Sequence, residues 1–101
     1  MTLNDNIEEE HIAGRKFDND KPRWDLLPLK SIEQVVQILT FGAQKYDDNN
    51  WKLVEPLDRY FAAAMRHITA HRQGEYLDSE SGLPHLAHAI TNLIFLNERS
   101  R

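Results

Sequence analysis

The sequence predicts an all-α protein, a small bundle of three main helices preceded by an extended N-terminal segment. Three stretches place apolar residues at spacings of three and four, the period of a helix with one buried face. No stretch alternates apolar and polar residues as a half-buried strand does. At 101 residues, the chain can build one modest core but not two. We therefore expect a single helical domain over residues 15–101.

The composition excludes several classes of function. The chain has no cysteine, which removes disulfides, thiolate zinc sites and thiol nucleophiles, so nitrogen and oxygen ligands must hold any metal. A formal net charge of −4 argues against a nucleic-acid binder, because phosphate contacts need a clustered basic surface. No apolar run approaches the roughly 20 residues that span a bilayer, and the acidic N-terminus is unlike a targeting leader. These features predict a cytoplasmic protein that does not enter membranes.

The N-terminal part of the chain divides into two segments. Residues 1–14 contain three consecutive glutamates and no apolar period, which predicts a flexible acidic tail. Residues 15–29 contain two prolines and should be extended. Four apolar side chains of this segment are expected to pack on the helices: Phe17, Trp24, Leu26 and Leu27. Three cations, Lys16, Lys21 and Arg23, form either a solvated loop or a clamp for a phosphorylated small molecule.

The first helix is expected from about Ser31 to Tyr46. Ser31 followed by Gln34 is a capping-box pattern. Apolar residues at helical spacing then predict one buried face: Ile32, Val35, Val36, Leu39, Ala43 and Tyr46. The helix should end at the turn-forming residues 47–50. Trp51 follows, where it serves either the core or the stacking of a base.

The second helix is expected to begin near Pro56, a residue favoured at the first helical position, and to end just before Gly74. Its predicted core face consists of Leu57, Tyr60, Phe61, Ala64, Met65 and Ile68. His67 and His71 lie one turn apart beside that face, a spacing at which two imidazoles can reach one metal ion. The same spacing also arises by accident on helix surfaces.

The third helix is expected from about Pro84 to Glu98. His85, His88 and Asn92 share one of its faces, flanked by Ala89 and Leu96, and should point inward. An unpaired buried polar group costs about 1–3 kcal/mol. These side chains therefore need either a hydrogen-bond network between helices or a bound metal or substrate. The remaining sides of this helix are also apolar, so we expect a second subunit to cover it in a homo-oligomer, a dimer or larger.

Three motifs, in this order, resemble the phage family of dATP/dGTP diphosphohydrolases: KFDNDKPRWDLLP, FGAQKYDDNNW and RHITAHRQGEYLDSESGLPHLAHAITNL. The resemblance covers about residues 15–97. That family is commonly grouped with the all-α, MazG-like nucleoside-triphosphate pyrophosphohydrolases, which hold Mg²⁺ through EExxE on one helix and ExxD on a later one. Here the first helix carries only Glu33, the third helix has HxxH, and ExxD occurs in the connecting segment.

The resemblance implies a nucleotide-binding hydrolase that converts a purine deoxynucleoside triphosphate, dATP or dGTP, to the monophosphate and pyrophosphate. It implies a divalent metal, Mg²⁺ or Mn²⁺. The expected metal ligands are Glu75, Asp78, His85 and His88, and the expected catalytic residues are His67, Glu75 and Asp78. The expected substrate-binding residues are Lys16, Lys21, Arg23 and Arg66 for the phosphates, and Tyr46, Asn50, Trp51 and Asn92 for the base.

The same residues are also compatible with two other functions. A phage protein that sequesters a host-defence nucleotide signal without hydrolysing it would need no metal, and the missing EExxE favours this alternative. A helical interaction module whose histidines form a structural network would need neither metal nor nucleotide. The HxxH and ExxD motifs favour the enzyme.

Overall fold

A computed structural model describes residues 14, 15, 17 and 19–100 of the chain. The predicted acidic tail lies outside the described residues except for Gly14, and so does Lys16. Within the described part, the fold is all-α as predicted, and its only β-pairing is an isolated bridge between Leu77 and Pro84. No helix in this part is long and apolar enough to cross a membrane.

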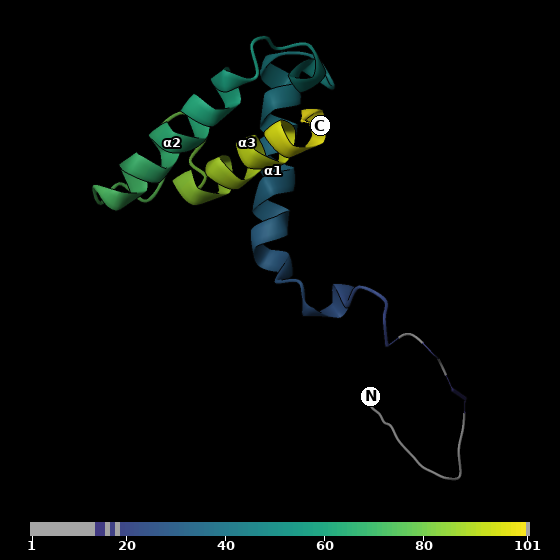
Figure 1. The fold of residues 1–101 in the computed structure, drawn as a ribbon. Helices are drawn as coiled ribbons and strands as arrows, with labels where there is room; N and C mark the ends of the chain where they lie inside the picture. Colours follow the sequence, from purple (N-terminus) through teal and green to yellow (C-terminus); the bar gives the residue numbers. More distant parts are fainter. Residues whose placement is uncertain (1–13, 16, 18, 101) are drawn as a thin grey trace.

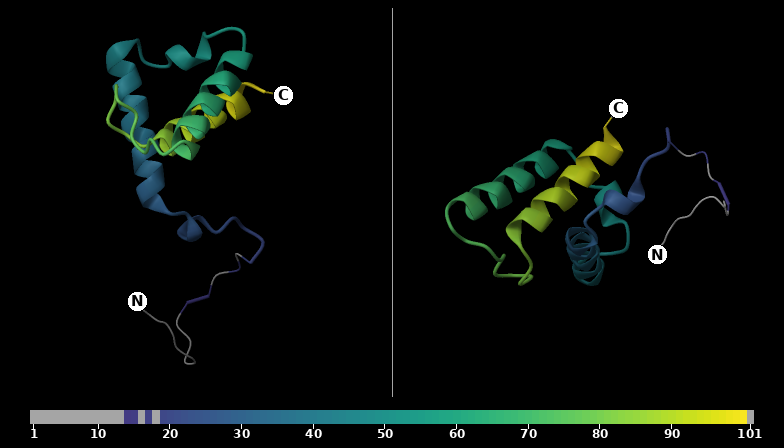
Figure 2. Two further views of the ribbon diagram at one scale, coloured as in Figure 1. Left: turned by 90° about the vertical axis from the view of Figure 1, so that its left-hand side faces the viewer. Right: turned by 90° about the horizontal axis from the view of Figure 1, so that it is seen from below.

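Three α-helices make up the body of the molecule: α1 (Leu29–Lys45), α2 (Asp58–Arg72) and α3 (His85–Arg99) (Figure 1). Two short 3-10 helices, η1 (Trp24–Leu26) and η2 (Asn50–Lys52), flank α1. Helices α2 and α3 lie side by side, and α1 crosses this pair (Figure 2). Helix α3 packs on both of the others, so it forms the centre of the bundle.

The sequence signals for the C-terminal ends of α1 and α2 were right, whereas the predicted starts at Ser31 and Pro56 lie two residues from the observed starts at Leu29 and Asp58. Helix α2 ends in a Schellman motif, in which the N–H groups of Gly74 and Glu75 donate 3.0 Å hydrogen bonds to carbonyls within the last turn. Gly74 has a φ of +99°, which only glycine adopts without strain. The capping box predicted at Ser31 is wrong, because α1 begins two residues earlier, after Pro28, and no side chain caps it.

The buried core is small. It contains Val35 and Ile38 from α1, Tyr60 and Ala64 from α2, and Ala87, Ala89 and Thr91 from α3. Three of these residues are alanines, and small side chains allow helices to pack closely. The core thus fixes the register of α2 against α3 without enclosing many large side chains.

Several residues predicted for the core are exposed. On α1, helix α3 packs against the face of Val35 and Ile38, so the adjacent face remains uncovered. The predicted core residues that are exposed by 39 to 58% are Val36, Leu39, Tyr46, Phe61 and Met65. Side chains of α3 are also exposed by 38 to 45%: Leu86, Ile90, Leu93 and Ile94. Coverage of these faces by a second subunit stays a prediction.

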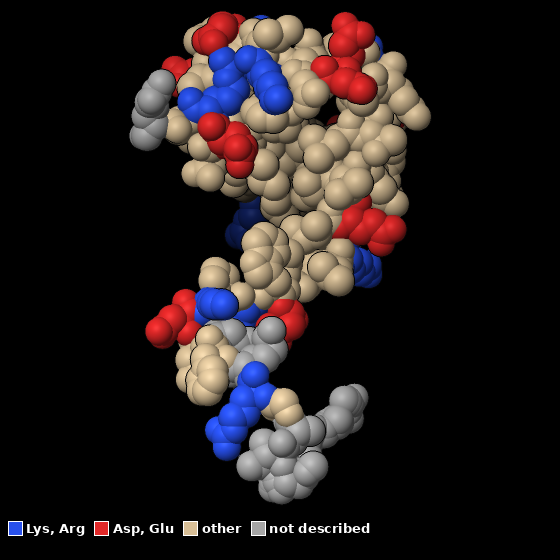
Figure 3. All heavy atoms as spheres, turned by 90° about the vertical axis from the view of Figure 1, so that its right-hand side faces the viewer, with Lys and Arg blue, Asp and Glu red and all other residues tan. Residues whose placement is uncertain are grey.

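The segment before α1 projects away from the bundle as an arm, defined here as residues 19–28 (Figures 1 and 3). The prediction that its apolar side chains pack on the helices is wrong. Phe17 is 85% exposed, Trp24 78% and Leu26 69%, and Leu27 is also exposed. The arm leaves the N-terminal end of α1, beyond the α2–α3 pair, where none of the described helices offers a surface.

Candidate functional site

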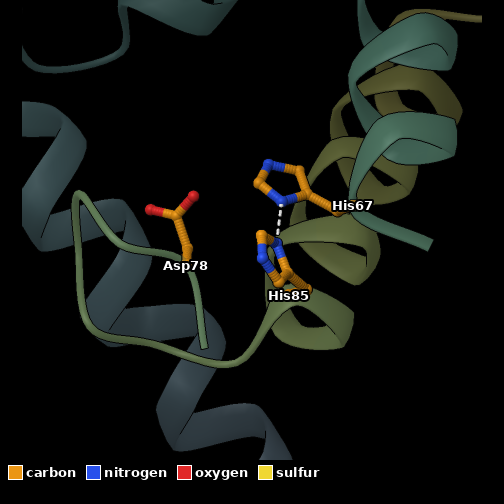
Figure 4. Close-up of side chains that lie close together, drawn as sticks. All are labelled: His67, Asp78 and His85. Carbon is orange, nitrogen blue, oxygen red and sulfur yellow. Dashed lines mark hydrogen bonds between the residues drawn. The ribbon is translucent and has the colours of Figure 1, made fainter. Parts of the chain in front are cut away.

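The pairing of α2 with α3 places His67 opposite the first turn of α3. Nδ1 of His67 lies 2.8 Å from Nδ1 of His85 (Figure 4). The ring of His67 also stacks on that of His88, with centroids 4.5 Å apart and planes 12° apart. Ligand atoms of His67, Asp78 and His85 all lie within 4.8 Å of one another. We call these three residues the histidine–aspartate cluster.

Asp78 is oriented by the loop that joins α2 to α3. Its Oδ2 accepts hydrogen bonds from the backbone N–H groups of Glu80 (3.1 Å) and Ser81 (2.9 Å). Its backbone N–H donates to the carbonyl of Leu83, and its carbonyl accepts from Gly82, both at 2.8 Å. Gly82 has a φ of +73°, which suits glycine in this tight turn. Local hydrogen bonds therefore hold the carboxylate beside the histidines.

One nitrogen of the cluster is buried without a partner. Nε2 of His85 makes no hydrogen bond, and the side chain of His85 is only 7% exposed. Oε2 of Glu75 lies 3.6 Å away, at the rim. When the proton shared with His67 resides on Nδ1 of His85, Nε2 carries an unshared electron pair. An unpaired imidazole nitrogen beside another imidazole and a carboxylate fits a divalent cation.

The pKa shifts around the cluster favour metal binding. Burial lowers the pKa of His67, and the neighbouring His88 and His85 lower it further. Burial also lowers the pKa of His88, against the opposing effect of Asp78. Burial opposes ionisation of Asp78, but the backbone N–H of Ser81 and the nearby His88 outweigh it and lower the pKa of this carboxyl group. Neutral imidazoles beside an ionised carboxylate are the protonation states that bind metals.

His88 is tied to the loop rather than to the cluster. Its Nε2 lies 2.6 Å from Oγ of Ser81, which accepts a 3.1 Å hydrogen bond from the N–H of Leu83. Because Oγ already accepts from Leu83, its own proton is available to Nε2 of His88. Oδ2 of Asp78 is 3.9 Å from the same nitrogen. His88 thus packs against His67 and connects it to the loop.

A cleft of about 750 Å³ adjoins the cluster, between the three helices and the loop around η2. Five of the predicted substrate-binding residues line it: Tyr46, Asn50, Trp51, Arg66 and Asn92. Arg66 directly precedes His67 on α2. On α3, Asn92 lies one turn after His88, and its Nδ2 donates a 2.9 Å hydrogen bond to the His88 carbonyl. Arg66 and Asn92 therefore place the cleft next to the cluster, although none of the cluster's three residues lines it.

The part of the cleft around Trp51 is aromatic. The ring of Trp51 stacks on that of Phe95, with centroids 5.1 Å apart and planes 8° apart. The hydroxyl of Tyr60 donates to the Trp51 carbonyl at 2.6 Å, and Arg99 donates to the same carbonyl at 3.1 Å. Trp51 is half-buried and lines the cleft, so it contributes to packing while remaining accessible to a ligand.

Comparison with known proteins gives the family. Residues 11–100 match the family described as dATP/dGTP diphosphohydrolase, N-terminal. The chain belongs to this family. It is 34% identical over 85 residues to a Salmonella phage PMBT28 protein named dATP/dGTP diphosphohydrolase, covering 84% of this chain and 29% of that protein. The chain thus spans about three tenths of that relative's length. No solved structure matches it.

In this dATP/dGTP diphosphohydrolase family member, several predicted site residues lie away from the cluster. Lys21 and Arg23 are on the arm, and Arg23 pairs with Asp25 at 2.7 Å. The structure therefore does not bring these two cations to the cleft of their own chain. His71 lies on α2 outside the cluster, because His67 pairs with His85 across the helices. Glu75, which is 57% exposed, lies at the rim of the cluster.

Three features of the site escaped the sequence reasoning. Ser81 positions both Asp78 and His88; its place three residues after Asp78, in a segment rich in Ser and Gly, is the spacing of a side-chain-capped turn. Arg59 lines the cleft, and its separation of seven residues from Arg66 places both on one face of α2. Asp47 and Asp48 also line the cleft, and the sequence identified them only as turn formers.

Proposed function

We propose that this protein hydrolyses a purine deoxynucleoside triphosphate to the monophosphate and pyrophosphate. The supporting observation is a cleft that contains the stacked rings of Trp51 and Phe95 and is also lined by Arg66, the residue before His67 of the histidine–aspartate cluster. Phe95 and His88 are seven residues apart on α3, or roughly 10 Å along the helix axis. Base and phosphates can therefore occupy opposite ends of one site. The name of the phage relative points to the same substrates.

The histidine–aspartate cluster would hold a divalent ion, with Glu75 at its rim. Bound there, the ion would polarise a phosphate oxygen and lower the pKa of a water ligand. Carboxylates suit both Mg²⁺ and Mn²⁺, whereas imidazoles favour transition metals, so two histidines make Mn²⁺ the better fit of the two predicted ions. His67, Asp78 and His85 would be its ligands once the hydrogen bond between the two imidazoles is broken, because a neutral imidazole that accepts this bond has no second electron pair to bind a metal. His88 would orient His67 through ring stacking.

The remaining residues would bind the substrate and move one proton. Arg66 would neutralise phosphate oxygens, as phosphoryl chemistry requires. Trp51 or Tyr46 would stack on the base, and Asn50 or Asn92 would contact its edge. A water oxygen would bond to the α-phosphorus as the bond from that phosphorus to the bridging oxygen breaks and pyrophosphate leaves. Oε2 of Glu75 would accept the proton of that water.

An incubation with a panel of nucleoside triphosphates tests the proposal. We expect dATP or dGTP to yield monophosphate and pyrophosphate with Mn²⁺ or Mg²⁺, and no product with EDTA. Asp78→Asn should abolish turnover, whereas Asp58→Asn, a matched charge removal at the exposed start of α2, should leave it unchanged. Intact triphosphates throughout, or full activity of Asp78→Asn, would overturn the assignment.

One observation supports nucleotide sequestration as a second candidate function. The cluster contains a single carboxylate, Asp78, and carboxylates are the usual ligands of Mg²⁺ at phosphate-processing sites. In that case the protein would bind a nucleotide in EDTA without turnover. Calorimetric titration of wild-type protein in EDTA, followed by chromatography of the recovered nucleotide, separates sequestration from hydrolysis.

A further inference from the structure

Arg99, in the last turn of α3, attaches the loop between α1 and α2 to the bundle. We call this loop, residues 46–57, the η2 loop. The guanidinium of Arg99 donates hydrogen bonds to the carbonyls of Trp51, at 3.1 Å, and Val54. The same group pairs with the carboxylate of Glu55, and its side chain is only 15% exposed. One planar side chain with several donors therefore binds three acceptors of the loop.

Trp51 is held through both its ring and its backbone by one face of α3. Phe95 and Arg99 lie four residues apart on this helix and therefore on the same face. The ring of Phe95 stacks on the indole, with centroids 5.1 Å apart, while Arg99 holds the carbonyl of the same residue. Tyr60 on α2 donates to that carbonyl as well, at 2.6 Å. These contacts fix the indole in the cleft that it lines.

The same face of α3 carries the histidines of the functional site. Its residues follow one another at spacings of three, four, three and four: His85, His88, Asn92, Phe95 and Arg99. His88 and Arg99 are eleven residues apart, or roughly 16 Å along the helix axis. The helix thus sets the distance between the histidines and Trp51, and Arg99 attaches the η2 loop to that helix.

The hydrogen bonds within η2 do not attach it to the bundle. Each of them joins an N–H group to a carbonyl three residues earlier. Leu53, which ends η2, is 78% exposed and adds little packing. Without Arg99, the carbonyl of Trp51 keeps the hydrogen bond from Tyr60, whereas Val54 loses its hydrogen bond to α3. The loop could then shift the indole relative to the histidine–aspartate cluster.

Lys52 does not prevent the indole from stacking on a base. Its Nζ lies 5.6 Å from the centroid of the Trp51 ring, and the residue is exposed. An exposed cation–π contact is weaker than the stacking of a base on an aromatic ring. Because Phe95 covers only one face of the indole, a base can displace the ammonium from the ring.

We propose that Arg99 is a positioning residue for nucleotide binding, which holds the η2 loop so that the purine stacks on Trp51. Arg99 does not line the cleft, and its charge is paired with Glu55, so it acts through Trp51 and not on the phosphates. The role in nucleotide binding rests on the proposed function, whereas the attachment of the loop rests on the contacts alone. Loss of Arg99 should weaken substrate binding and leave the chemistry at the histidine–aspartate cluster unchanged.

The fluorescence of Trp51 tests the attachment of the loop without any nucleotide. The chain has two tryptophans, and Trp24→Phe removes the other one, which is 78% exposed on the arm. In this background, Arg99→Ala should shift the emission of Trp51 to the red and increase its quenching by acrylamide, because the released loop exposes the indole to water. Arg72→Ala, which removes an exposed arginine from the end of α2, is the matched control and should change neither. Unchanged emission and quenching in Arg99→Ala would overturn the proposal.

Steady-state kinetics test the effect on binding. Arg99→Ala should raise KM for the triphosphate about 10-fold, within the range expected for loss of base stacking, and leave kcat within about twofold of wild type. It should also retain the Mn²⁺ shift in Tm. Arg99→Lys keeps the charge beside Glu55 but lacks the planar fork, so its KM should be intermediate, and it carries the test if Arg99→Ala does not fold. A wild-type KM with a kcat that falls together with Tm would indicate a merely structural role and overturn the proposal.

A double-mutant cycle tests whether Arg99 acts through Trp51. Trp51→Ala should raise KM by about the same factor, and adding Arg99→Ala should raise it no further, because both changes remove one contact. Additive effects, or a wild-type KM in Trp51→Ala, would overturn this path.

A triphosphate analogue with a methylene group between the α- and β-phosphorus gives the same comparison as dissociation constants. Its binding should quench Trp51, and the Arg99→Ala variant should bind it about 10-fold more weakly. Binding by wild-type protein without any change in Trp51 fluorescence would overturn stacking on this residue. Wild-type protein that neither binds the analogue nor hydrolyses any triphosphate would instead overturn the proposed function, while acrylamide quenching still decides whether Arg99 holds the loop.

Discussion

Asp78→Asn should destabilise the metal-free protein and remove its stabilisation by Mn²⁺. The substitution preserves the shape of the side chain and removes only its charge. The wild-type carboxylate accepts hydrogen bonds of 2.9 and 3.1 Å from two backbone N–H groups. A charged acceptor contributes about 1 kcal/mol more per hydrogen bond than a neutral one. The two hydrogen bonds together therefore lose about 2 kcal/mol, which in a domain of this size lowers Tm by roughly 8–16 °C.

The Tm difference between wild type and Asp78→Asn should become smaller at low pH. The pKa of Asp78 is lowered in the folded protein. A carboxyl group with a lowered pKa stabilises the fold fully above its unfolded pKa of about 3.9 and loses that contribution as pH falls through the folded value. The Tm difference between wild type and Asp78→Asn should therefore persist from pH 7 to about pH 5 and shrink below about pH 4.

Mn²⁺ should increase the Tm difference between wild type and Asp78→Asn. An ion at 100 times its dissociation constant stabilises the folded state by about 2.7 kcal/mol, which raises Tm by roughly 10–20 °C in a domain of this size. Differential scanning calorimetry should show this shift for the wild type and for Asp58→Asn, which lies far from the cluster on α2. An equal Mn²⁺ shift in Asp78→Asn would refute the histidine–aspartate cluster as the metal site.

Three further predictions concern the cleft, the end of α2 and the histidine–aspartate cluster. Arg66→Ala should raise KM for the triphosphate about 10-fold or more while leaving the Mn²⁺ shift in Tm unchanged, measured by steady-state kinetics and calorimetry. Gly74→Ala should destabilise the protein by about 1 kcal/mol or more in urea unfolding, because Gly74 has a φ of +99°; Gly42→Ala, within α1 and with no atom near its added Cβ, should not. The pKa of His67 is lowered from 6.5, so kcat/KM should fall only below about pH 6.5, as this imidazole gains a proton.

The features that the sequence predicted correctly are those with a local physical cause. A 3.6-residue period reports a helix wherever it occurs, and a glycine after the last apolar residue reports a helix end, as Gly74 does. The inward direction of His85 followed from its position beside Ala89 on one helical face. None of these inferences depends on which helices pack against each other.

The predictions that were wrong are those that depend on which face of a helix packs against another helix. Val35 and Val36 are neighbours on α1, and only the packing of α3 makes the first buried and the second 53% exposed. Likewise, the approach of His67 to His85 depends on the register of α2 against α3, which spacing within one helix cannot report. The capping box at Ser31 failed because α1 begins earlier, after Pro28.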